Sequence, residues 1–506
     1  MNKNFKILLF YPNEPLLGIA PSNLAILSAC LKAAGFDVKL FDCTLYKPYN
    51  KQTQDETREK LGQVLKTNIE EYIHLKRENI YDDFVRIVNE YEPQLIAITL
   101  IDSTIKFSLS FIEKIKEKNI PIVVGGVGTT FLFEKILNSG LIKYACIGEG
   151  EEAIVELAQK IKENKDTTNI KNIYVREDNG NIIKNVLRSL VNLNDLPIPD
   201  FSIYEYERFY RPFMGNVVRM MQIDIDRGCP FTCTYCAAPT LRKKYKNEGC
   251  GHYYRVKNWD KVFNEIKILV KKHNLSCLWI SSETLLALPL KKFKEFAERY
   301  INEVNLPFWC QSRLDTFSEE KTKLLAEMGC RAISIGLEHG SEKIRKELLK
   351  KNITNKQVLN AIKVISKYNF SITVNNIIGF PDETRENIFE TIELNKKINA
   401  IMGGKHTVNV FTFIPFSGTE LRRISIEKGY ITGDEDIPLS FFEESMLTMP
   451  SLSKEEIKGL EKTLALYIFL PKEYWSKIKL AEKDTEEGNK IFNELIQIKN
   501  GLSKKS

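Results

Sequence analysis

The sequence lacks the marks of a membrane, secreted or nucleic-acid-binding protein. None of its apolar runs reaches the ~18 residues that a membrane-spanning helix needs. The apolar run 7–11 is too short for a secretory signal, and no small-residue cleavage site follows it, so a buried first strand explains it better. The net charge is only +7 over 506 residues without a long basic block, which disfavours nucleic acid as a partner.

Cysteine is also scarce, with 10 residues in the chain, which excludes a disulfide-built scaffold. Seven of the cysteines are scattered, mostly within apolar runs, and are interpreted as small buried hydrophobes. The other three, Cys229, Cys233 and Cys236, stand close together. A reducing cytoplasm and one cysteine-ligated metal site fit this distribution best.

The length predicts about three domains. Residues 1–165 alternate strand-length apolar runs with helical patterns, which is typical of a doubly wound, flavodoxin-like α/β domain with a parallel sheet. Its expected strands are 5–11, 38–41, 94–101, 120–124 and 144–147. The polar stretch 51–91 predicts an inserted helical pair. Residues 166–214 predict a hairpin and a connector rich in proline and aromatics, which packs between domains or, alternatively, borders the substrate.

Strand and helix patterns alternate again over residues 215–425. Six strands are expected, at 221–226, 277–281, 307–311, 332–336, 371–378 and 407–413. A helix is expected after each of the first five, including one at 341–349. These units predict a partial (βα)6 barrel with its chemistry on the loops that follow the strands. Residues 426–506 predict a helical C-terminal region.

The three clustered cysteines directly follow the first expected barrel strand, with the spacing C-x3-C-x2-C. Three thiolates on one loop can hold three irons of a [4Fe–4S] cluster and leave the fourth iron open to a small ligand. A structural zinc ion needs four ligands, normally from two paired half-sites. The sequence has no second C-x2-C, although Cys250 or His252 would be available as a fourth ligand. The glycine, proline and threonine residues around the cysteines favour a loop over unliganded core cysteines.

The cysteine motif, with its aromatic residue before the last cysteine, resembles that of the radical S-adenosylmethionine (SAM) superfamily, over residues 215–425. The resemblance implies that Cys229, Cys233 and Cys236 hold the cluster, that SAM binds the open iron, and that Tyr235 packs near the adenine. It also implies an electron donor such as flavodoxin or ferredoxin. The further SAM contacts that it implies are Ser282, Glu283, Gln311, Arg313, Glu338, Ser341 and Gly379. The serine pair 281–282 departs from the glycines or acidic residues that the family often carries there.

The N-terminal domain resembles the cobalamin-binding (B12-binding) class of that superfamily, in its class B-type, methyltransferase-like form. The resemblance lies in segments 18–31, 125–130 and 148–152, where glycine-rich loops at strand ends let a large flat ligand approach the backbone. The cobalamin contacts that it implies are Gly18, Gly125, Gly126, Gly128, Thr129, Gly148 and Glu149. No G-x-G-x-x-G follows the first strand, which disfavours a dinucleotide site. No D-x-H-x-x-G occurs either, so no histidine of that motif would ligate cobalt, and an empty structural domain remains an alternative.

The resemblance implies a cytoplasmic enzyme that cleaves SAM with its cluster and, with cobalamin, methylates an unactivated carbon of a small molecule. Two alternatives remain open: a non-methylating rearrangement or cyclisation, and a non-catalytic corrinoid-binding protein. The intact cysteines argue against the second alternative. A tRNA methylthiotransferase is disfavoured because neither an RNA-binding domain nor a second cysteine triad is apparent. Nothing in the sequence names the substrate.

Overall fold

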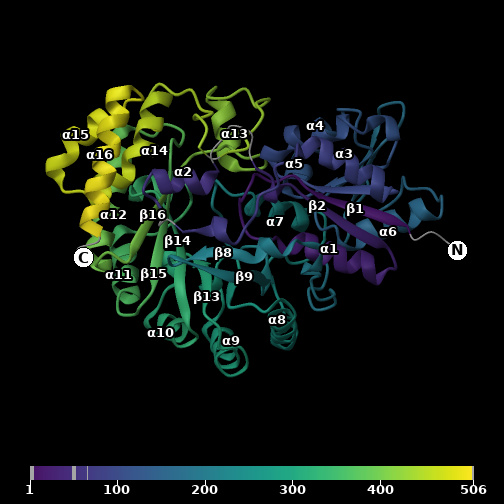
Figure 1. The fold of residues 1–506 in the computed structure, drawn as a ribbon, viewed down its shortest axis with the longest axis horizontal. Helices are drawn as coiled ribbons and strands as arrows, with labels where there is room; N and C mark the ends of the chain where they lie inside the picture. Colours follow the sequence, from purple (N-terminus) through teal and green to yellow (C-terminus); the bar gives the residue numbers. More distant parts are fainter. Residues whose placement is uncertain (1–4, 48–52, 65–66, 441, 504–506) are drawn as a thin grey trace.

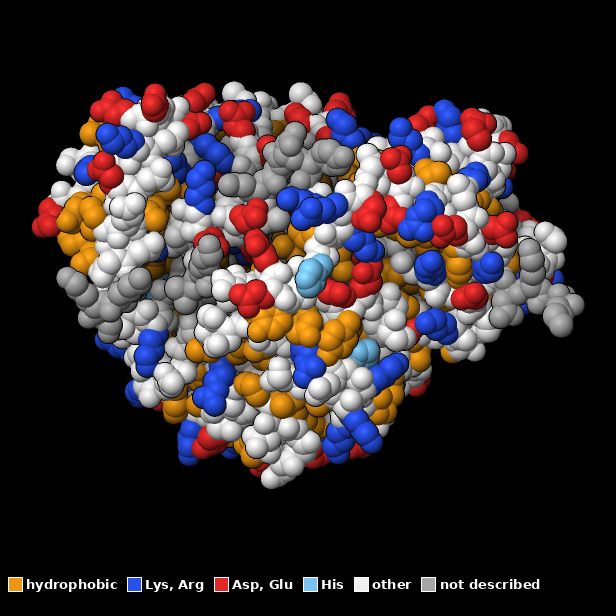
Figure 2. All heavy atoms as spheres, in the orientation of Figure 1, with side chains coloured by type: hydrophobic (Ala, Val, Ile, Leu, Met, Phe, Trp, Pro, Cys, Tyr) orange, Lys and Arg blue, Asp and Glu red, His pale blue; other side chains and the backbone are white. Residues whose placement is uncertain are grey.

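The structure is a computed structural model that describes residues 5–47, 53–64, 67–440 and 442–503. Two sheets lie side by side, and a group of C-terminal helices covers the far end of the second sheet (Figure 1). Lys, Arg, Asp and Glu side chains are interspersed over the face shown in Figure 2, in keeping with the small net charge. No helix in the described part of the chain combines the length and apolar character needed to cross a membrane.

The N-terminal sheet has the strand order β2-β1-β3-β4-β5-β6-β7. The first five strands run parallel, which confirms the expected doubly wound, flavodoxin-like sheet. They are β1 (Lys6–Tyr11), β2 (Asp37–Asp42), β3 (Leu95–Thr99), β4 (Ile122–Gly125) and β5 (Tyr144–Cys146). The expected hairpin, β6 (Ile173–Arg176) and β7 (Ile182–Ile183), pairs antiparallel with β5, so it extends this sheet.

Helices cover both faces of this sheet because its strands are apolar on both sides. In β1, Ile7 and Leu9 belong to one buried cluster, whereas Leu8 and Phe10 belong to another on the opposite face. The helices that connect the strands are α1 (Ser22–Ala33), α3 (Ile80–Tyr91), α4 (Ile105–Glu113), α5 (Val127–Leu137) and α6 (Glu151–Lys162).

The expected inserted pair is present as α2 (Gln54–Lys60) and α3, although residues 51–52 and 65–66 of the stretch lie outside the described part of the chain. α3 packs on the N-terminal sheet through Phe84 and Val88. α2 instead reaches the second sheet, where it lies beside the C-terminal helices (Figure 1).

The second sheet has the order β16-β15-β14-β13-β12-β9-β8, and all its strands except β8 run parallel. This confirms a partial barrel of six parallel strands. The parallel strands are β9 (Asn216–Asp224), β12 (Cys277–Ser281), β13 (Phe308–Ser312), β14 (Cys330–Glu338), β15 (Ser371–Ile378) and β16 (His406–Thr412). β8 (Tyr210–Phe213) adds an antiparallel edge that the sequence did not predict.

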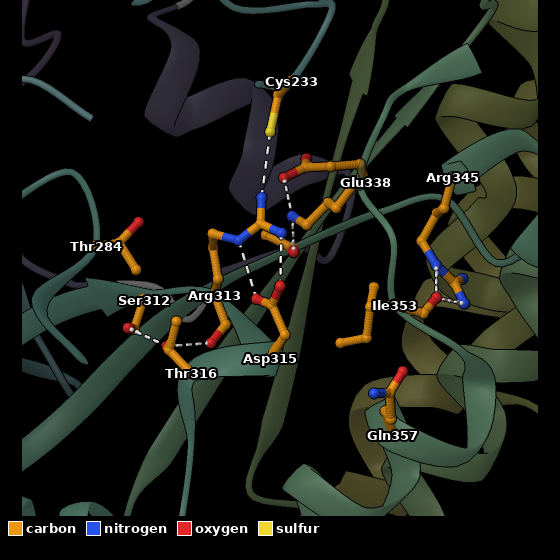
Figure 3. A network of polar contacts seen from close by, with 12 residues as sticks. Cys233, Thr284, Ser312, Arg313, Asp315, Thr316, Glu338, Arg345, Ile353 and Gln357 are labelled. Carbon is orange, nitrogen blue, oxygen red and sulfur yellow. Dashed lines mark hydrogen bonds and ion pairs between the residues drawn. The ribbon is translucent and has the colours of Figure 1, made fainter. Parts of the chain in front are cut away.

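Helices cover the outer face of this half-barrel. They are α8 (Trp259–His273), α9 (Leu290–Glu303), α10 (Glu319–Glu327), α11 (Asn355–Ile365) and α12 (Arg385–Met402). Along β15 and β16, buried outward-facing residues alternate with half-buried residues on the inner face. The expected helix at 341–349 is only a π-helical turn, Ile344–Leu348, where the buried Arg345 side chain donates to the Ile353 carbonyl oxygen (Figure 3).

The C-terminal region is helical, as expected. Its helices are α13 (Glu420–Glu427), α14 (Lys454–Phe469), α15 (Trp475–Ala481) and α16 (Glu486–Ser503). α14 begins at a capping box formed by Ser453 and Glu456, and it packs against β16 and α12 through an apolar cluster that includes Leu460 and Leu464. In the connector, the aromatic side chains of Phe201, Tyr204 and Phe209 are buried in the main core, which agrees with the packing interpretation.

Candidate functional site

The three clustered cysteines line one cavity of about 240 Å³ on the loops that follow the half-barrel strands. The short strand β10 (Asp226–Arg227) ends just before the motif, and α7 (Ala238–Asn247) begins just after it. Gly228 has φ +90°, and a Cβ there would lie 2.4 Å from the Tyr253 carbonyl oxygen. Only glycine therefore fits between the strand and the first cysteine. Thr234 anchors the loop because its backbone N–H donates to Leu349 and its hydroxyl donates to Leu348.

The chemistry of this cavity fits an iron–sulfur cluster. All three thiols are free, and burial raises the pKa of Cys229 and raises that of Cys236 to about 11. Within the described ranges, no three His, Cys, Asp or Glu side chains are grouped around one point for a single metal ion. A cubane cluster is wider than a single metal ion, so its cysteine ligands stand farther apart, with one cysteine for each of three irons. The Arg313 guanidinium donates to Cys233 Sγ at 3.2 Å, so its positive charge would stabilise a thiolate there (Figure 3).

Five of the residues expected to contact SAM line the same cavity. They are Tyr235, Glu283, Gln311, Arg313 and Glu338. The other three, Ser282, Ser341 and Gly379, are absent from its wall. The buried Ser282 hydroxyl donates to Asp226 Oδ2 at 2.7 Å, so this side chain is engaged within the protein.

Polar residues that were not among the expected contacts also line the cavity, notably Lys351 and Asn375. Asn375 follows from the alternation of β15, whereas Lys351 lies on the segment between β14 and α11 and had no local signal. Lys351 Nζ lies 3.0 Å from Glu338 Oε1, which also accepts from the Tyr235 hydroxyl at 3.1 Å. Asn375 stands on the inner face of β15 and donates to Ser334 Oγ at 2.8 Å. The two contacts to Glu338 fix its carboxylate at the cavity wall.

His339, on the loop after β14, is fully buried and is absent from the cavity wall. Its Nδ1 accepts from the Ser341 backbone N–H at 2.9 Å, so Nε2 carries the proton and donates to Glu383 Oε1 at 2.6 Å. The other oxygen of Glu383 accepts from the N–H groups of Gly379 and Phe380. Ser341 and Gly379 thus belong to a clamp that joins the loops after β14 and β15.

A second cavity, of about 210 Å³, lies at the carboxyl ends of the N-terminal strands. Its wall is largely apolar, with Leu24, Val123 and Ile154 among its residues. Of the residues expected to contact cobalamin, Gly125, Gly126, Gly148 and Glu149 line this cavity. Gly18, Gly128 and Thr129 are not part of its wall. An elongated, partly apolar ligand fits this site, as it does at the switch point of other doubly wound sheets.

The glycines of this cavity serve two different purposes. A Cβ on Gly125 would lie 3.7 Å from Cys146 Cβ, an ordinary contact, so the cavity has room there for a ligand. A Cβ on Gly126 would lie 2.5 Å from the Leu100 carbonyl oxygen, and one on Gly128 would lie 2.7 Å from the Ile101 carbonyl carbon. Gly126 and Gly128 therefore permit close packing between loops, and Gly126 also lines the cavity.

Arg227 connects the two sites, because it lines the second cavity and stands two residues before Cys229, which lines the first. Its guanidinium donates to Glu149 Oε1 at 2.9 Å. Arg255, from β11 (Arg255–Val256), donates to Glu149 Oε2 at 3.2 Å. Farther along, Asp102 after β3 accepts from the Ser417 backbone N–H after β16, at 2.6 Å. The carboxyl ends of the two sheets therefore face each other.

Replacing Glu149 with glutamine is expected to weaken the contact that Glu149 makes with Arg227 and Arg255 between the two sheets. Burial alone would raise the pKa of Glu149, but the hydrogen bonds and charges of Arg255 and Arg227 outweigh it and hold that pKa below its usual value. E149Q should therefore lower the free energy of unfolding by about 2–4 kcal/mol near pH 7.5. Because a lowered pKa stabilises only the ionised form, this deficit should shrink as the pH falls below ~4.3.

Chemical denaturation at pH 7.5 and at pH 4 would measure the difference between E149Q and the wild type. E163Q is the matched control, since Glu163 pairs with Lys165 at the surface, where solvent screens the pair and its loss should change stability little. An equal loss in the free energy of unfolding for E149Q and E163Q would show that the contact of Glu149 with the two arginines adds no stability.

Two family models match the chain and together span more than half of it. The model described as the B12 binding domain matches residues 17–158, and that of the radical SAM superfamily matches residues 223–394. An uncharacterized methyltransferase of Pyrococcus horikoshii is 26% identical over 70% of this chain and 73% of its own length. Cytidylyl-2-hydroxyethylphosphonate methyltransferase of Streptomyces wedmorensis is 22% identical over 90% of this chain and 88% of its own.

Two solved structures share the fold. The radical SAM methyltransferase TsrM of Kitasatospora setae, solved with tryptophan and a SAM analogue, has a TM-score of 0.60 at 17% identity, over 84% of this chain and 77% of its own. The cobalamin-dependent radical enzyme OxsB, solved with aqua-cobalamin and SAM, has a TM-score of 0.64 at 15% identity, over 98% of this chain and 71% of its own. The chain thus belongs to the radical SAM superfamily, among its members that carry a B12 binding domain.

Proposed function

We propose that this protein uses a [4Fe–4S] cluster to cleave SAM and, with cobalamin, methylates an unactivated carbon of a small-molecule substrate. The observation that carries the proposal is that the two cavities lie on facing sheet edges, which the pairing of Arg227 with Glu149 and the contact of Asp102 with Ser417 hold together. Methyl transfer between reacting groups requires short distances, and facing cavities provide them. The methyltransferase names of two relatives support the same reaction class.

When bound, the cluster supplies the electron that cleaves SAM, and cobalamin supplies the methyl group. Cys229, Cys233 and Cys236 would hold the cluster, with the Arg313 guanidinium beside the Cys233 sulfur. Tyr235 and Glu338 would bind SAM, since Lys351 and the Tyr235 hydroxyl hold the Glu338 carboxylate at the cavity wall. Gly125 would leave the backbone open to the cobalamin, and Gly148 would lie beside it in the wall of the same cavity.

The chain's other contributions are positioning and the exclusion of water. The clamp of His339 and Glu383 fixes the loops after β14 and β15 behind the SAM cavity. The pairing of Glu149 with Arg227 and Arg255 keeps the N-terminal cavity next to the cysteine loop. A flavodoxin or ferredoxin of the cytoplasm would supply the electron.

SAM with a labelled methyl group tests the proposal on anaerobically loaded, reduced protein supplied with a small-molecule extract of the source cells. The label should appear first in the cobalamin fraction and then in a product, alongside 5′-deoxyadenosine and S-adenosylhomocysteine. Formation of 5′-deoxyadenosine with an altered substrate but no label in either fraction would contradict methyl transfer and favour a rearrangement or cyclisation.

A further inference from the structure

The open side of the half-barrel, between its edge strands β8 and β16, is covered by the insertion that contains α2. On one edge, the Arg58 guanidinium of α2 lies over the Phe411 ring of β16, 5.3 Å from its centroid. On the other edge, the Tyr72 ring lies 5.3 Å from the Tyr210 ring of β8. The insertion of the N-terminal sheet therefore closes the interior of the second sheet.

Three arginines from separate elements come together under this cover. Arg58 belongs to α2, Arg208 to the short 3-10 helix Tyr206–Phe209, and Arg211 to β8. The pKa of Arg211 is lowered to about 10, chiefly by burial, with Asp55 opposing this effect and the positive charges of Arg208 and Arg58 adding to it. These three residues are called the arginine cluster below, and Arg211 lies close enough to the other two to feel their charges.

The arginine cluster has fewer partners than its donors require. Arg208 is 2% exposed and donates to Asp42 at 2.8 Å, but its Nη2 is buried with no hydrogen-bond partner. Arg58 Nη1 lies 3.8 Å from Asp55 Oδ1, and the Nε of Arg58 is likewise buried without a hydrogen-bond partner. Arg211 donates to the Leu16 carbonyl oxygen at 3.4 Å, and among the described residues no carboxylate lies within ion-pair distance of it.

A buried guanidinium without a full set of acceptors costs several kcal/mol, so a protein retains such a group mainly where a ligand completes it. Guanidinium groups bind carboxylates and phosphates through paired, parallel hydrogen bonds. The unmet donors of Arg58 and Arg208, together with the weakly paired Arg211, form a preorganised site for one anion.

The arginine cluster lines neither of the two cavities, but its contacts lead toward both of them. Arg208 donates to the Gly18 carbonyl oxygen and Arg211 to that of Leu16, in the loop after β1 of the N-terminal sheet. Phe411, under Arg58, stands two residues after Asn409 in β16. Asn409 in turn donates to Asn375, which lines the cysteine cavity. A molecule held by the arginine cluster can thus extend toward the gap between the two cavities.

We infer that the substrate carries an anionic group, a carboxylate or a phosphate or phosphonate, which Arg58, Arg208 and Arg211 bind at the covered side of the half-barrel. This inference rests on the proposed function, because it assigns the substrate class of that same site. Arg211 is the residue whose removal should weaken anion binding most, since no carboxylate within the described ranges forms an ion pair with it.

Three probe anions would test the site on the full-length, cluster-loaded protein: inorganic phosphate, methylphosphonate and acetate. Each is titrated at constant ionic strength while the thermal unfolding midpoint is followed. We expect a saturable rise for at least one anion, and R211Q should weaken its apparent affinity at least ~10-fold. R211K should recover part of the loss because it keeps the charge but not the paired donors. R86Q is the control, because Arg86 lies on the exposed face of α3.

The three probes distinguish the sources of the anionic group. Tighter binding of phosphate and methylphosphonate would assign a phosphoryl or phosphonyl substrate, whereas tighter binding of acetate would assign a carboxylate. If R211Q does not fold, R58Q provides the same comparison. Absence of saturable binding, or equal affinity in R211Q and the wild type, would overturn the inference. Because 5′-deoxyadenosine formation is measured on the same wild-type sample, failure of the proposed function would be recognised separately.

Discussion

Replacing Cys229, Cys233 and Cys236 together with alanine is expected to abolish both iron binding and SAM cleavage. These three thiols are the sulfur ligands of the cavity, and no other cysteine lines it. Without them no residue remains to hold a cubane cluster, so the variant should yield no 5′-deoxyadenosine. Iron and sulfide analysis after anaerobic reconstitution should give about four of each per wild-type chain and almost none for the variant.

C250A is the matched control for this experiment. Cys250 is buried on the loop after α7, where its thiol contacts the Glu248 carbonyl oxygen and does not reach the cavity. The C250A protein should therefore bind iron and cleave SAM as the wild type does. Full iron content in the triple variant, or stoichiometric zinc in wild-type protein prepared without oxygen, would contradict the cluster assignment.

Gly125→Leu is expected to prevent cobalamin retention while leaving the fold intact. A Cβ at this position makes only an ordinary contact with Cys146, so the extra side chain would extend into the N-terminal cavity and occupy its limited volume. The apparent affinity for hydroxocobalamin should fall at least ~100-fold, since a filled cavity leaves no space for the ligand. Absorption spectra of desalted protein after incubation with hydroxocobalamin would measure the retained fraction.

Gly125→Ala is the graded control, because a single methyl group fills little of the cavity and should weaken retention far less. Gly126→Ala should behave differently, since its Cβ would collide with the Leu100 carbonyl oxygen and its φ is +100°. That variant should lose thermal stability before ligand is added. Retention in Gly125→Leu equal to that of the wild type would contradict the assignment of this cavity to cobalamin.

Much of the fold follows from local patterns in the sequence. The apolar runs at 5–11 and 94–101 become β1 and β3 because each is buried on both faces of a parallel sheet. The hairpin of β6 and β7 is predictable from its turn, but its pairing with β5 is not, because hydrogen bonding at a sheet edge depends on the tertiary arrangement. The same reason explains why the edge strand β8 was missed.

In the site, too, some features can be predicted from local sequence and others depend on the tertiary arrangement. The three cysteines stand within one short segment, so their common role can be predicted from spacing alone. Glu149 was expected to contact cobalamin, but its pairing with Arg227 and Arg255 was not foreseen, because these partners are 78 and 106 residues away in the chain. The arginine cluster joins α2 to residues some 150 positions later, and no local pattern signals such a meeting.

The most direct test of the whole account is a single preparation of the full-length protein, reconstituted with iron, sulfide and hydroxocobalamin without oxygen. Iron, cobalamin and, after reduction with SAM present, 5′-deoxyadenosine are then quantified on that one sample. The account predicts about four irons and one cobalamin per chain, together with 5′-deoxyadenosine. Iron and 5′-deoxyadenosine without retained cobalamin would refute the facing-cofactor arrangement, and zinc without 5′-deoxyadenosine would refute the radical chemistry itself.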